Sequence, residues 1–443
     1  MNFTFPKDFL FGAASSACQI EAGCKEGGKG EDGGEHFYTV FPEKYFGGDP
    51  AKAADFYHLY RKDILDMKEL GLKSFRFSIS WSRVLPQGVG QLNDKGMDYY
   101  KRVINDLNEN GIIPNVTLYH WDLPQVLEDR GGWVNRDSIE WFGEYAHKMF
   151  STFGDVVPMW STVNEPIATY VGYAHGGFAP GYFNESWGNQ ARHNILVAHG
   201  KGVEAFRAIN PKNSKIGVVI DIWKRHALTN SPEDIALMID QDERNWKFYT
   251  DPILAGKYSD YILEHLEKEG TLMQMEPHDF ELTGQPLDFF GLNVYNRVPV
   301  TVNQQAQMDF SQGGNFLNNR TEYYPKAVYD AIHLLHDLYD IKCPIYITEN
   351  GCALPNIDDQ EKECDDPERV GYLREHLRMC CRLIKCGYNL KGYMYWNDAD
   401  SYEELDGYRL RFGLTWVDHK TGERRWKKSR HYFSEICKSK LVN

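Results

Sequence analysis

Residues 159–166 read Met-Trp-Ser-Thr-Val-Asn-Glu-Pro, a short and mostly apolar run that ends in a carboxylate and is stopped at once by proline. Residues 345–351 read Ile-Tyr-Ile-Thr-Glu-Asn-Gly and follow the same pattern, with glycine as the stop. Short apolar runs of this kind are typical of strands buried on both faces of a parallel sheet. A charged group at the tip of such a strand costs free energy unless it is paired or used. Both stretches therefore predict buried strands that carry a carboxyl group at the C-terminal tip.

Six further runs of the same kind are spaced along the chain, with helical patterns between them. The eight predicted strands are residues 9–14, 74–79, 113–118, 159–163, 215–220, 287–293, 344–348 and 392–396. The predicted helices are residues 54–70, 96–110, 138–153, 189–209, 232–249, 325–339 and 367–386. Eight strands alternating with helices predict an α/β fold, a closed (β/α)8 TIM barrel, and we expect residues 1–443 to form this single domain.

An open, doubly wound sheet is the alternative architecture, and its mark is a Gly-rich turn that joins a strand to a helix. Residues 27–30, Gly-Gly-Lys-Gly, lack the G-x-G-x-x-G spacing, so we interpret them as a flexible loop. Segments longer than a minimal barrel needs follow predicted strands at residues 21–50, 123–136, 171–187 and 298–324. We therefore expect extended βα loops on the C-terminal face, where barrels build active sites.

The composition limits which partners and which cellular compartment we expect. The 443 residues carry 49 Lys and Arg against 63 Asp and Glu, a net charge of −14, which argues against nucleic acid or an anionic membrane as the partner. No apolar run approaches the ~18 residues of a membrane span, and the N-terminus lacks a basic segment followed by an apolar one. Nine cysteines without a Cys-x-x-Cys pair argue against a disulfide framework. We expect a cytoplasmic protein, and nothing in the sequence indicates its oligomeric state.

The two strand-tip carboxylates, Glu165 and Glu349, belong to the fourth and seventh predicted strands and so should face each other across the barrel mouth. An N-cap role for either is the structural alternative, although Glu caps poorly compared with Asp or Ser. Paired carboxyl groups flanking a bond are the machinery of glycoside hydrolysis: one donates a proton to the leaving oxygen and the other attacks the anomeric carbon. A separation of about 5–5.5 Å would mean retention of configuration.

Beyond these two glutamates, characteristic motifs recur over nearly the whole chain. They are Phe-Leu-Phe-Gly-Ala-Ala (9–14), Gln-Ile-Glu (19–21), Phe-Arg-Phe-Ser-Ile-Ser-Trp-Ser-Arg (75–83), Thr-Leu-Tyr-His-Trp-Asp-Leu-Pro (117–124), Thr-Val-Asn-Glu-Pro (162–166), Asn-Val-Tyr (293–295), Ile-Thr-Glu-Asn-Gly (347–351) and Arg-Phe-Gly-Leu (411–414). In these motifs the chain resembles the family 1 glycoside hydrolases, the β-glucosidase family of retaining (β/α)8 enzymes. The resemblance implies an exo-acting, retaining β-glycosidase, first of all a β-glucosidase, working by double displacement through a covalent glycosyl-enzyme.

The resemblance also implies roles at the reacting bond, with Glu165 as the acid/base and Glu349 as the nucleophile. Arg76 lies in an apolar strand inside the barrel and needs an anion; Glu349 is the candidate, and a structural ion pair is the alternative. Tyr295 would hydrogen-bond Glu349 and orient its attacking oxygen.

The remaining predicted site residues would contact the sugar. Asn164 resembles the residue that binds the 2-hydroxyl, a contact expected to strengthen in the transition state. Trp396 would be the platform on which the sugar ring stacks, although a core tryptophan is the alternative, as a core histidine is for His120. The full predicted set is Gln19, His120, Trp121, Asn164, Asn293, Trp396, Glu403 and Glu404.

The motif after the eighth strand departs from the family pattern. Residues 397–404 read Asn-Asp-Ala-Asp-Ser-Tyr-Glu-Glu where the family has Ser-Leu-x-Asp-Asn-Phe-Glu-Trp. Glu403 is kept, and the family uses that residue to grip the outer hydroxyls of the glycone, whereas Glu404 replaces a tryptophan beside it. Either the loop has moved and Glu404 points to solvent around a reshaped glucoside pocket, or Glu404 lies in the pocket and favours a glycone with an extra donor, such as an amino sugar.

Related branches and other protein classes remain as alternatives. The retained Glu403 would repel the phosphate of a 6-phospho-glycoside, and Glu165 is the acid that the thioglucosidase branch lacks. A metal hydrolase would need ligands, but the histidine pairs 193/199 and 333/336 have no accompanying carboxylate and no His-x-His follows a strand, so we predict no metal and no cofactor. A non-catalytic carbohydrate-binding relative would be expected to lose a catalytic carboxylate, and both are present. The predicted partner is a small carbohydrate or glycoside.

Overall fold

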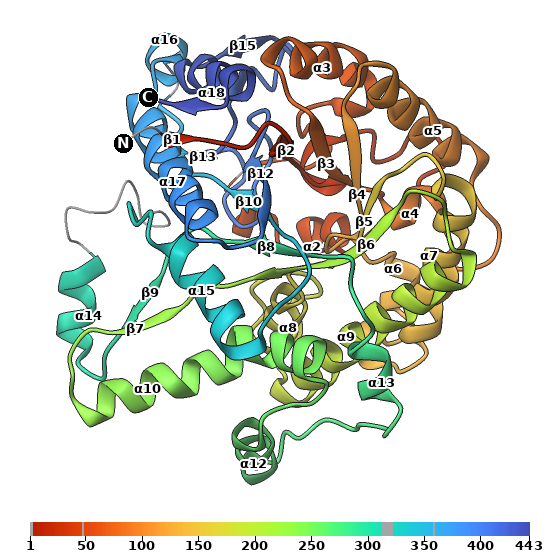
Figure 1. Cartoon of the computed structure of the whole chain (residues 1–443). Helices are drawn as coiled ribbons and strands as arrows, with labels where there is room; N and C mark the ends of the chain where they lie inside the picture. The colour runs from red at the N-terminus through yellow and green to blue at the C-terminus, as the bar shows by residue number, and fades with distance from the viewer. Residues whose placement is uncertain (1–2, 47, 312–321, 358) are drawn as a thin grey trace.

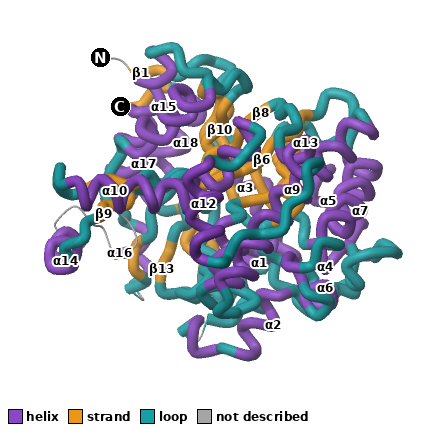
Figure 2. The backbone as a smooth tube through the Cα atoms, turned by 90° about the horizontal axis from the view of Figure 1, so that it is seen from below, coloured by secondary structure: helices purple, strands orange, loops and turns teal. Residues whose placement is uncertain are grey.

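The computed structural model describes residues 3–46, 48–311, 322–357 and 359–443. Within these ranges, eight parallel strands close into a barrel surrounded by helices (Figures 1 and 2). In chain order the barrel strands are β2 (Leu10–Ala14), β3 (Ser74–Ser78), β4 (Ile113–Tyr119), β5 (Met159–Asn164), β6 (Lys215–Asp221), β8 (Phe289–Asn293), β10 (Ile345–Asn350) and β12 (Leu390–Trp396). The predicted (β/α)8 barrel is confirmed, and each predicted strand ends within two residues of an observed one.

Closure of the sheet rules out the open, doubly wound alternative. β10 pairs with both β8 and β12, and β12 pairs in turn with β2, so the last strand meets the first. By this order Glu165 follows the fourth barrel strand and Glu349 lies in the seventh, as predicted.

The helices that cover the barrel form where apolar residues recur at helical spacing. Figure 1 shows α3, α5 and α7 on one side of the strands and α15 and α17 on the other. In α3 the side chains of Phe56, Tyr60, Ile64 and Met67 are buried, and Gly71 ends the helix at φ 98°, a conformation that favours glycine. The outer helices named so far, with two more, are α3 (Phe56–Leu70), α5 (Asp94–Glu109), α7 (Ser138–Phe153), α9 (Glu185–Ile209), α15 (Ala327–Tyr339), α17 (Pro367–Lys385) and α18 (Lys428–Ser439).

One predicted helix needs correction, and one helix at the C-terminal end was not predicted. The helix predicted for residues 232–249 is α10 (Pro232–Asp242) followed by a π-helical segment, η3 (Glu243–Lys247), in which Asn245 leaves the helical conformation. The Asp242 carboxylate accepts from the Arg225 backbone amide and the Trp246 indole, which holds the chain at this break. Helix α18 was not predicted, although its Phe433, Ile436 and Cys437 are buried at helical spacing.

The long segments predicted from the sequence follow the C-terminal ends of barrel strands, as expected. They contain α2 (Gly33–Val40) after β2, α6 (Gln125–Glu128) and η2 (Gly132–Val134) after β4, α8 (Ile167–Ala174) after β5, and β9 (Val298–Val300) and α14 (Gln304–Ser311) after β8. Residues 312–321 of the predicted 298–324 segment lie outside the described residues. The glycine cluster at residues 27–30 is a loop as predicted, but it is tied down: Gly30 donates to the Ser82 carbonyl and Gly27 accepts from the Asn93 amide.

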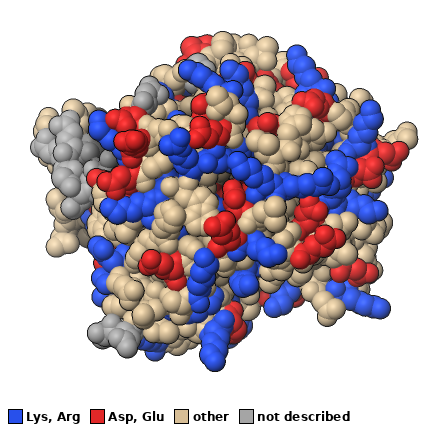
Figure 3. Space-filling view, turned by 90° about the horizontal axis from the view of Figure 1, so that it is seen from above, with Lys and Arg blue, Asp and Glu red and all other residues tan. Residues whose placement is uncertain are grey.

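The two termini pair with each other, and charges of both signs cover the surface. β1 (Phe3–Thr4) pairs antiparallel with β16 (Leu441–Val442), which brings the two ends of the chain side by side (Figure 1). Acidic and basic side chains are interspersed across the face shown in Figure 3. In the part of the chain that the structure describes, no helix combines the length and the apolar character that crossing a membrane requires.

Candidate active site

The predicted site residues gather at the C-terminal ends of the barrel strands. Arg76 lies in β3, Asn164 ends β5, Asn293 ends β8, Glu349 lies in β10 and Trp396 ends β12. The other predicted residues lie in the segments that follow strand ends: Gln19 after β2, His120 and Trp121 after β4, Glu165 after β5, Tyr295 after β8, and Glu403 and Glu404 after β12. The barrel therefore brings together residues that are up to 385 positions apart in the sequence.

Glu349 is held by two donors. Its Oε1 accepts from Arg76 Nη1 at 2.5 Å, and its Oε2 accepts from the Tyr295 hydroxyl at 2.8 Å. Arg76 is fully buried, and its Nη2 donates to Asn164 Oδ1 at 2.6 Å. Both predicted contacts to Glu349 are confirmed, and charge-assisted bonds of this kind favour the ionised carboxylate.

Glu165 has a different environment. Its backbone adopts φ 42°, in the left-handed region that non-glycine residues seldom occupy, and its amide donates to the Val219 carbonyl of β6 at 3.0 Å. Its Oε1 accepts from Asn293 Nδ2 at 2.6 Å. This strained turn directs the carboxyl group into the same cavity as Glu349.

The surrounding charges distinguish the two carboxyl groups. Burial, the Asp221 carboxylate and Glu349 together raise the pKa of Glu165 well above its usual range. Burial also raises the pKa of Glu349, but there the Arg76 guanidinium and hydrogen bonds from Arg76 and Tyr295 oppose the rise. The cation contacts Glu349 whereas anions face Glu165, so the proton belongs on Glu165 and the negative charge on Glu349.

The two carboxyl groups line the same cavity, which opens to solvent. Its walls are Gln19, His120, Trp121, Glu165, Phe178, Trp223, Tyr295, Glu349, Trp396, Glu403, Glu404 and Phe412. The His120 and Trp396 rings stack with centroids 5.9 Å apart, and burial next to Arg76 lowers the pKa of His120, which keeps the imidazole neutral. Nine of the twelve predicted site residues thus line one cavity.

The other three predicted residues lie behind the wall. Arg76, Asn164 and Asn293 are fully buried and do not line the cavity. Asn164 Oδ1 accepts from Arg76 and from Asn293 Nδ2, and its Nδ2 is 3.1 Å from His120 Nε2. In this structure these residues position Glu165, Glu349 and His120 through hydrogen bonds.

The loop after β12 places Glu403 and Glu404 at the cavity. Gln19 Nε2 donates to Glu403 Oε2 at 3.3 Å, and backbone bonds between Glu403 and Gly407 close the turn. Glu404 is partly buried and is one of the residues that line the cavity.

Sequence reasoning missed four residues near the reacting groups. Phe178, Trp223 and Phe412 line the cavity from loops, and Asp221, at the end of β6, faces Glu165. The sequence did point to Asp221, because it is a third carboxylate at the tip of an apolar strand, like Glu165 and Glu349.

The histidines considered as metal ligands have other partners. His193 bonds the Tyr258 hydroxyl and Asp279, at 2.9 and 3.0 Å, and His199 bonds the Thr162 hydroxyl at 2.6 Å. Among the residues that the structure describes, no three His, Cys, Asp or Glu side chains cluster in a way that would hold a metal ion.

Comparisons with known proteins agree with this geometry. The model of the family "Glycosyl hydrolase family 1" matches residues 1–442. "Beta-glucosidase A" of Acetivibrio thermocellus is 38% identical, and that of Thermotoga maritima 35% identical, over 99% and 98% of both chains. Among solved structures, a Thermotoga maritima β-glucosidase in complex with glucoimidazole superimposes with a TM-score of 0.92 at 34% identity, covering 99% of each chain. This chain belongs to glycosyl hydrolase family 1.

Proposed function

We propose that this chain is an exo-acting, retaining β-glucosidase in which Glu349 is the nucleophile and Glu165 the acid/base. The observation that carries the proposal is the unequal setting of two carboxyl groups on one cavity: Glu349 accepts from Arg76 and Tyr295, while Glu165 faces Asp221. The relatives support glucose as the glycone, since they are named β-glucosidases and one structure holds glucoimidazole.

The reaction would run in two displacements. Glu349 attacks the anomeric carbon while Glu165 gives its proton to the leaving oxygen, which breaks the glycosidic bond and forms a covalent glycosyl-enzyme. Glu165, now ionised, then takes a proton from water as the water oxygen attacks the same carbon and releases Glu349. Two inversions leave the sugar in its original configuration.

Supporting side chains would orient the reactants. Arg76 and Tyr295 hold both oxygens of Glu349, so little reorganisation accompanies the attack. We propose that Gln19, His120, Trp121, Trp396, Glu403 and Glu404 contact the sugar from the cavity wall. The predicted contact of Asn164 with the 2-hydroxyl stays a prediction, since Asn164 lies behind the cavity wall and there bonds His120.

The alternative functions have less support. An amino-sugar glycone is not favoured, because the relatives at 35–38% identity are named for β-glucosidase or glucan glucohydrolase activity. A non-catalytic binding relative is disfavoured by the two retained carboxyl groups. We also propose a cytoplasmic location, supported by nine cysteines that are all free thiols, and a single domain over residues 1–443.

Proton NMR of the first-formed sugar tests the proposal. With an aryl β-glucoside as substrate, we expect β-glucose to appear first and to mutarotate later. Initial release of α-glucose would contradict the retaining mechanism, and the absence of hydrolysis would contradict the enzyme assignment.

A further inference from the structure

A second cavity adjoins the active-site cavity on the side of Glu165, and we call it the leaving-group cavity. Glu165 and Trp223 line both cavities, whereas Glu349, Trp396 and Glu403 line only the first. Because Glu165 is the proposed proton donor to the leaving oxygen, the leaving group departs into the cavity that Glu349 does not line. Its volume of about 350 Å³ is enough for a substituted aromatic ring.

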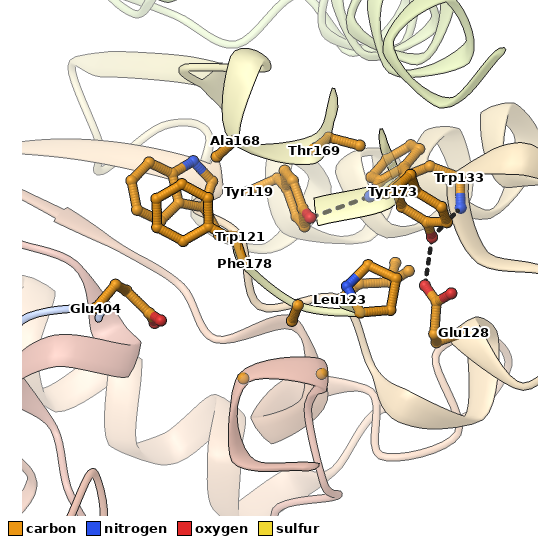
Figure 4. A pocket seen from close by; sticks show the side chains of 14 residues that line it. Tyr119, Trp121, Leu123, Glu128, Trp133, Ala168, Thr169, Tyr173, Phe178 and Glu404 are labelled. Atoms are coloured by element: carbon orange, nitrogen blue, oxygen red, sulfur yellow. Dashed lines mark hydrogen bonds between the residues drawn. The ribbon is translucent and has the colours of Figure 1, made fainter. Parts of the chain in front are cut away.

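The walls of the leaving-group cavity are mainly aromatic and apolar. Trp223 stacks on Tyr295, with ring centroids 5.7 Å apart and ring planes 18° from parallel. Trp121 and Phe178 lie against each other with centroids 5.3 Å apart (Figure 4). The buried Trp246 adds a further ring. Flat apolar faces of this kind favour an aromatic leaving group, which can stack on them.

Arg225 is the feature of the leaving-group cavity that stacking does not explain. Of the described residues that line either cavity, it is the only lysine or arginine. Its Nη1 donates to the Trp223 carbonyl at 2.7 Å, but its Nε has no hydrogen-bond partner, and no carboxylate of the described residues forms an ion pair with it. Burial lowers the pKa of Arg225, against the through-space attraction of Asp242 and Asp221. A cation in such surroundings costs free energy unless it is paired or used, so an anionic ligand is the partner that it fits.

Neighbouring segments hold Arg225 in place. Its strand, β7 (Arg225–Ala227), pairs with β9, with Arg225 opposite Val298, and Figure 1 shows both strands beside α10. The Asp242 carboxylate accepts from the Arg225 backbone amide at 3.0 Å and from the Trp246 indole at 2.8 Å. One carboxylate therefore fixes the strand of the cation and an aromatic wall relative to each other. A cation positioned in this way binds an anion with little loss of conformational entropy.

Charges of opposite sign divide the leaving-group cavity. Asp221 faces Glu165 and would repel an anion beside the reacting bond. Arg225 lines the same cavity and forms no ion pair with Asp221, so its charge is open to a ligand. A leaving group therefore fits with its phenolic oxygen at Glu165 and a negative substituent at Arg225. The planar guanidinium matches a carboxylate in shape as well as in charge.

We propose that Arg225 makes this chain selective for leaving groups that are aromatic and carry a carboxylate, so that its preferred substrates are β-glucosides of phenolic acids. The inference rests on the proposed function and extends it to the class of the leaving group. The bond that breaks joins the anomeric carbon to the phenolic oxygen. Water supplies a hydroxyl to the sugar and a proton to that oxygen, and the carboxylate leaves unchanged.

Substrates that differ in one charge test this inference. The full chain is given 4-carboxyphenyl β-glucoside and its methyl ester at neutral pH, and the 3-carboxyphenyl pair is treated in the same way. For each pair, the charge ratio is kcat/KM for the acid divided by kcat/KM for the ester. In Arg225→Gln we expect the charge ratio of at least one pair to fall at least tenfold below that of the parent. Both proteins are compared on the same pair, so the difference in leaving-group reactivity cancels.

A control variant and an inhibition measurement accompany this comparison. Lys224→Gln is the matched control, because it removes the same charge from the neighbouring residue, which lines neither cavity. We expect its charge ratio to stay within twofold of that of the parent. Inhibition of the parent by the free leaving group needs no variant. We expect 3- or 4-hydroxybenzoate to inhibit at a concentration at least tenfold lower than its methyl ester.

The outcomes separate this inference from the proposed function. Hydrolysis of the esters with an unchanged charge ratio in Arg225→Gln would overturn the inference and leave the proposed function standing, as would an equal fall in Lys224→Gln. If Arg225→Gln does not fold, inhibition of the parent decides, and equal inhibition by acid and ester overturns the inference. The absence of hydrolysis of all four glucosides would overturn the proposed function and the inference together.

Discussion

Replacing Arg76 by methionine should shift the acidic limb of the pH–rate profile to higher pH. Arg76 contacts Glu349 at 2.5 Å and is fully buried, so the substitution removes the cation that keeps this carboxyl group ionised. Only ionised Glu349 can attack, and the rate falls as pH drops through its pKa. Raising that pKa therefore brings the fall in rate to a higher pH.

The magnitude follows from the ion pair. Unit charges about 4 Å apart attract by about 4 kcal/mol at an effective dielectric constant of about 20. At about 1.36 kcal/mol per pKa unit this is about 3 units, and carboxylates beside arginine are typically lowered by about 1–3. We expect the acidic limb of the kcat/KM profile of Arg76→Met to lie about 1–3 pH units higher than that of the parent.

The assay is kcat/KM for an activated aryl β-glucoside against pH, with thermal unfolding measured in parallel. Removing one partner of a buried ion pair costs about 3–5 kcal/mol, so a lower Tm is expected as well. Arg76→Lys is the control, because it keeps the charge and should keep the limb closer to that of the parent. A folded Arg76→Met protein whose acidic limb stays in place would refute the reasoning.

Three further predictions concern the acid, its neighbour and metals. Glu165→Gln should lower kcat/KM about 10²–10⁴-fold for alkyl glucosides, which need a proton on the leaving oxygen, and less for a dinitrophenyl glucoside; equal losses would argue against the acid role. Asp221→Asn removes an anion that raises the pKa of Glu165. Because activity is lost as pH rises through that pKa, the alkaline limb should move to lower pH, and an unmoved limb would show that Asp221 does not act on Glu165. Prolonged EDTA treatment should leave the rate unchanged; a loss restored by a divalent ion would contradict the metal-free mechanism.

Much of the barrel and the catalytic pair could be predicted, because both depend on local signals. A short apolar run stopped by proline or glycine marks a buried strand, and a glutamate at its tip is conspicuous because burial of its charge needs a reason. Glu165 directly follows its strand, and Glu349 is the last residue but one of its own. Strand order then follows from chain order, because βα units wind in one direction.

What could not be predicted depends on contacts between segments distant in sequence. Asp221 faces Glu165 only because β6 pairs with β5, and Phe178 and Phe412 reach the cavity from loops whose paths no periodicity describes. The position of Glu404 was left open because it depends on how the turn at Glu403 and Gly407 closes. The break at Asn245 interrupts an apolar pattern that, taken locally, continues as a helix.

Capture of the covalent intermediate tests the unequal roles of the two carboxyl groups most directly. In Glu165→Gln, a dinitrophenyl β-glucoside should glycosylate the protein faster than water can release the sugar, because the base for the second step is missing. Peptide mapping by mass spectrometry should then find one glucosyl group on the peptide that contains Glu349, attached to its carboxyl group. A burst of dinitrophenol with the sugar on a different residue, or turnover with no covalent adduct under any condition, would contradict the assignment.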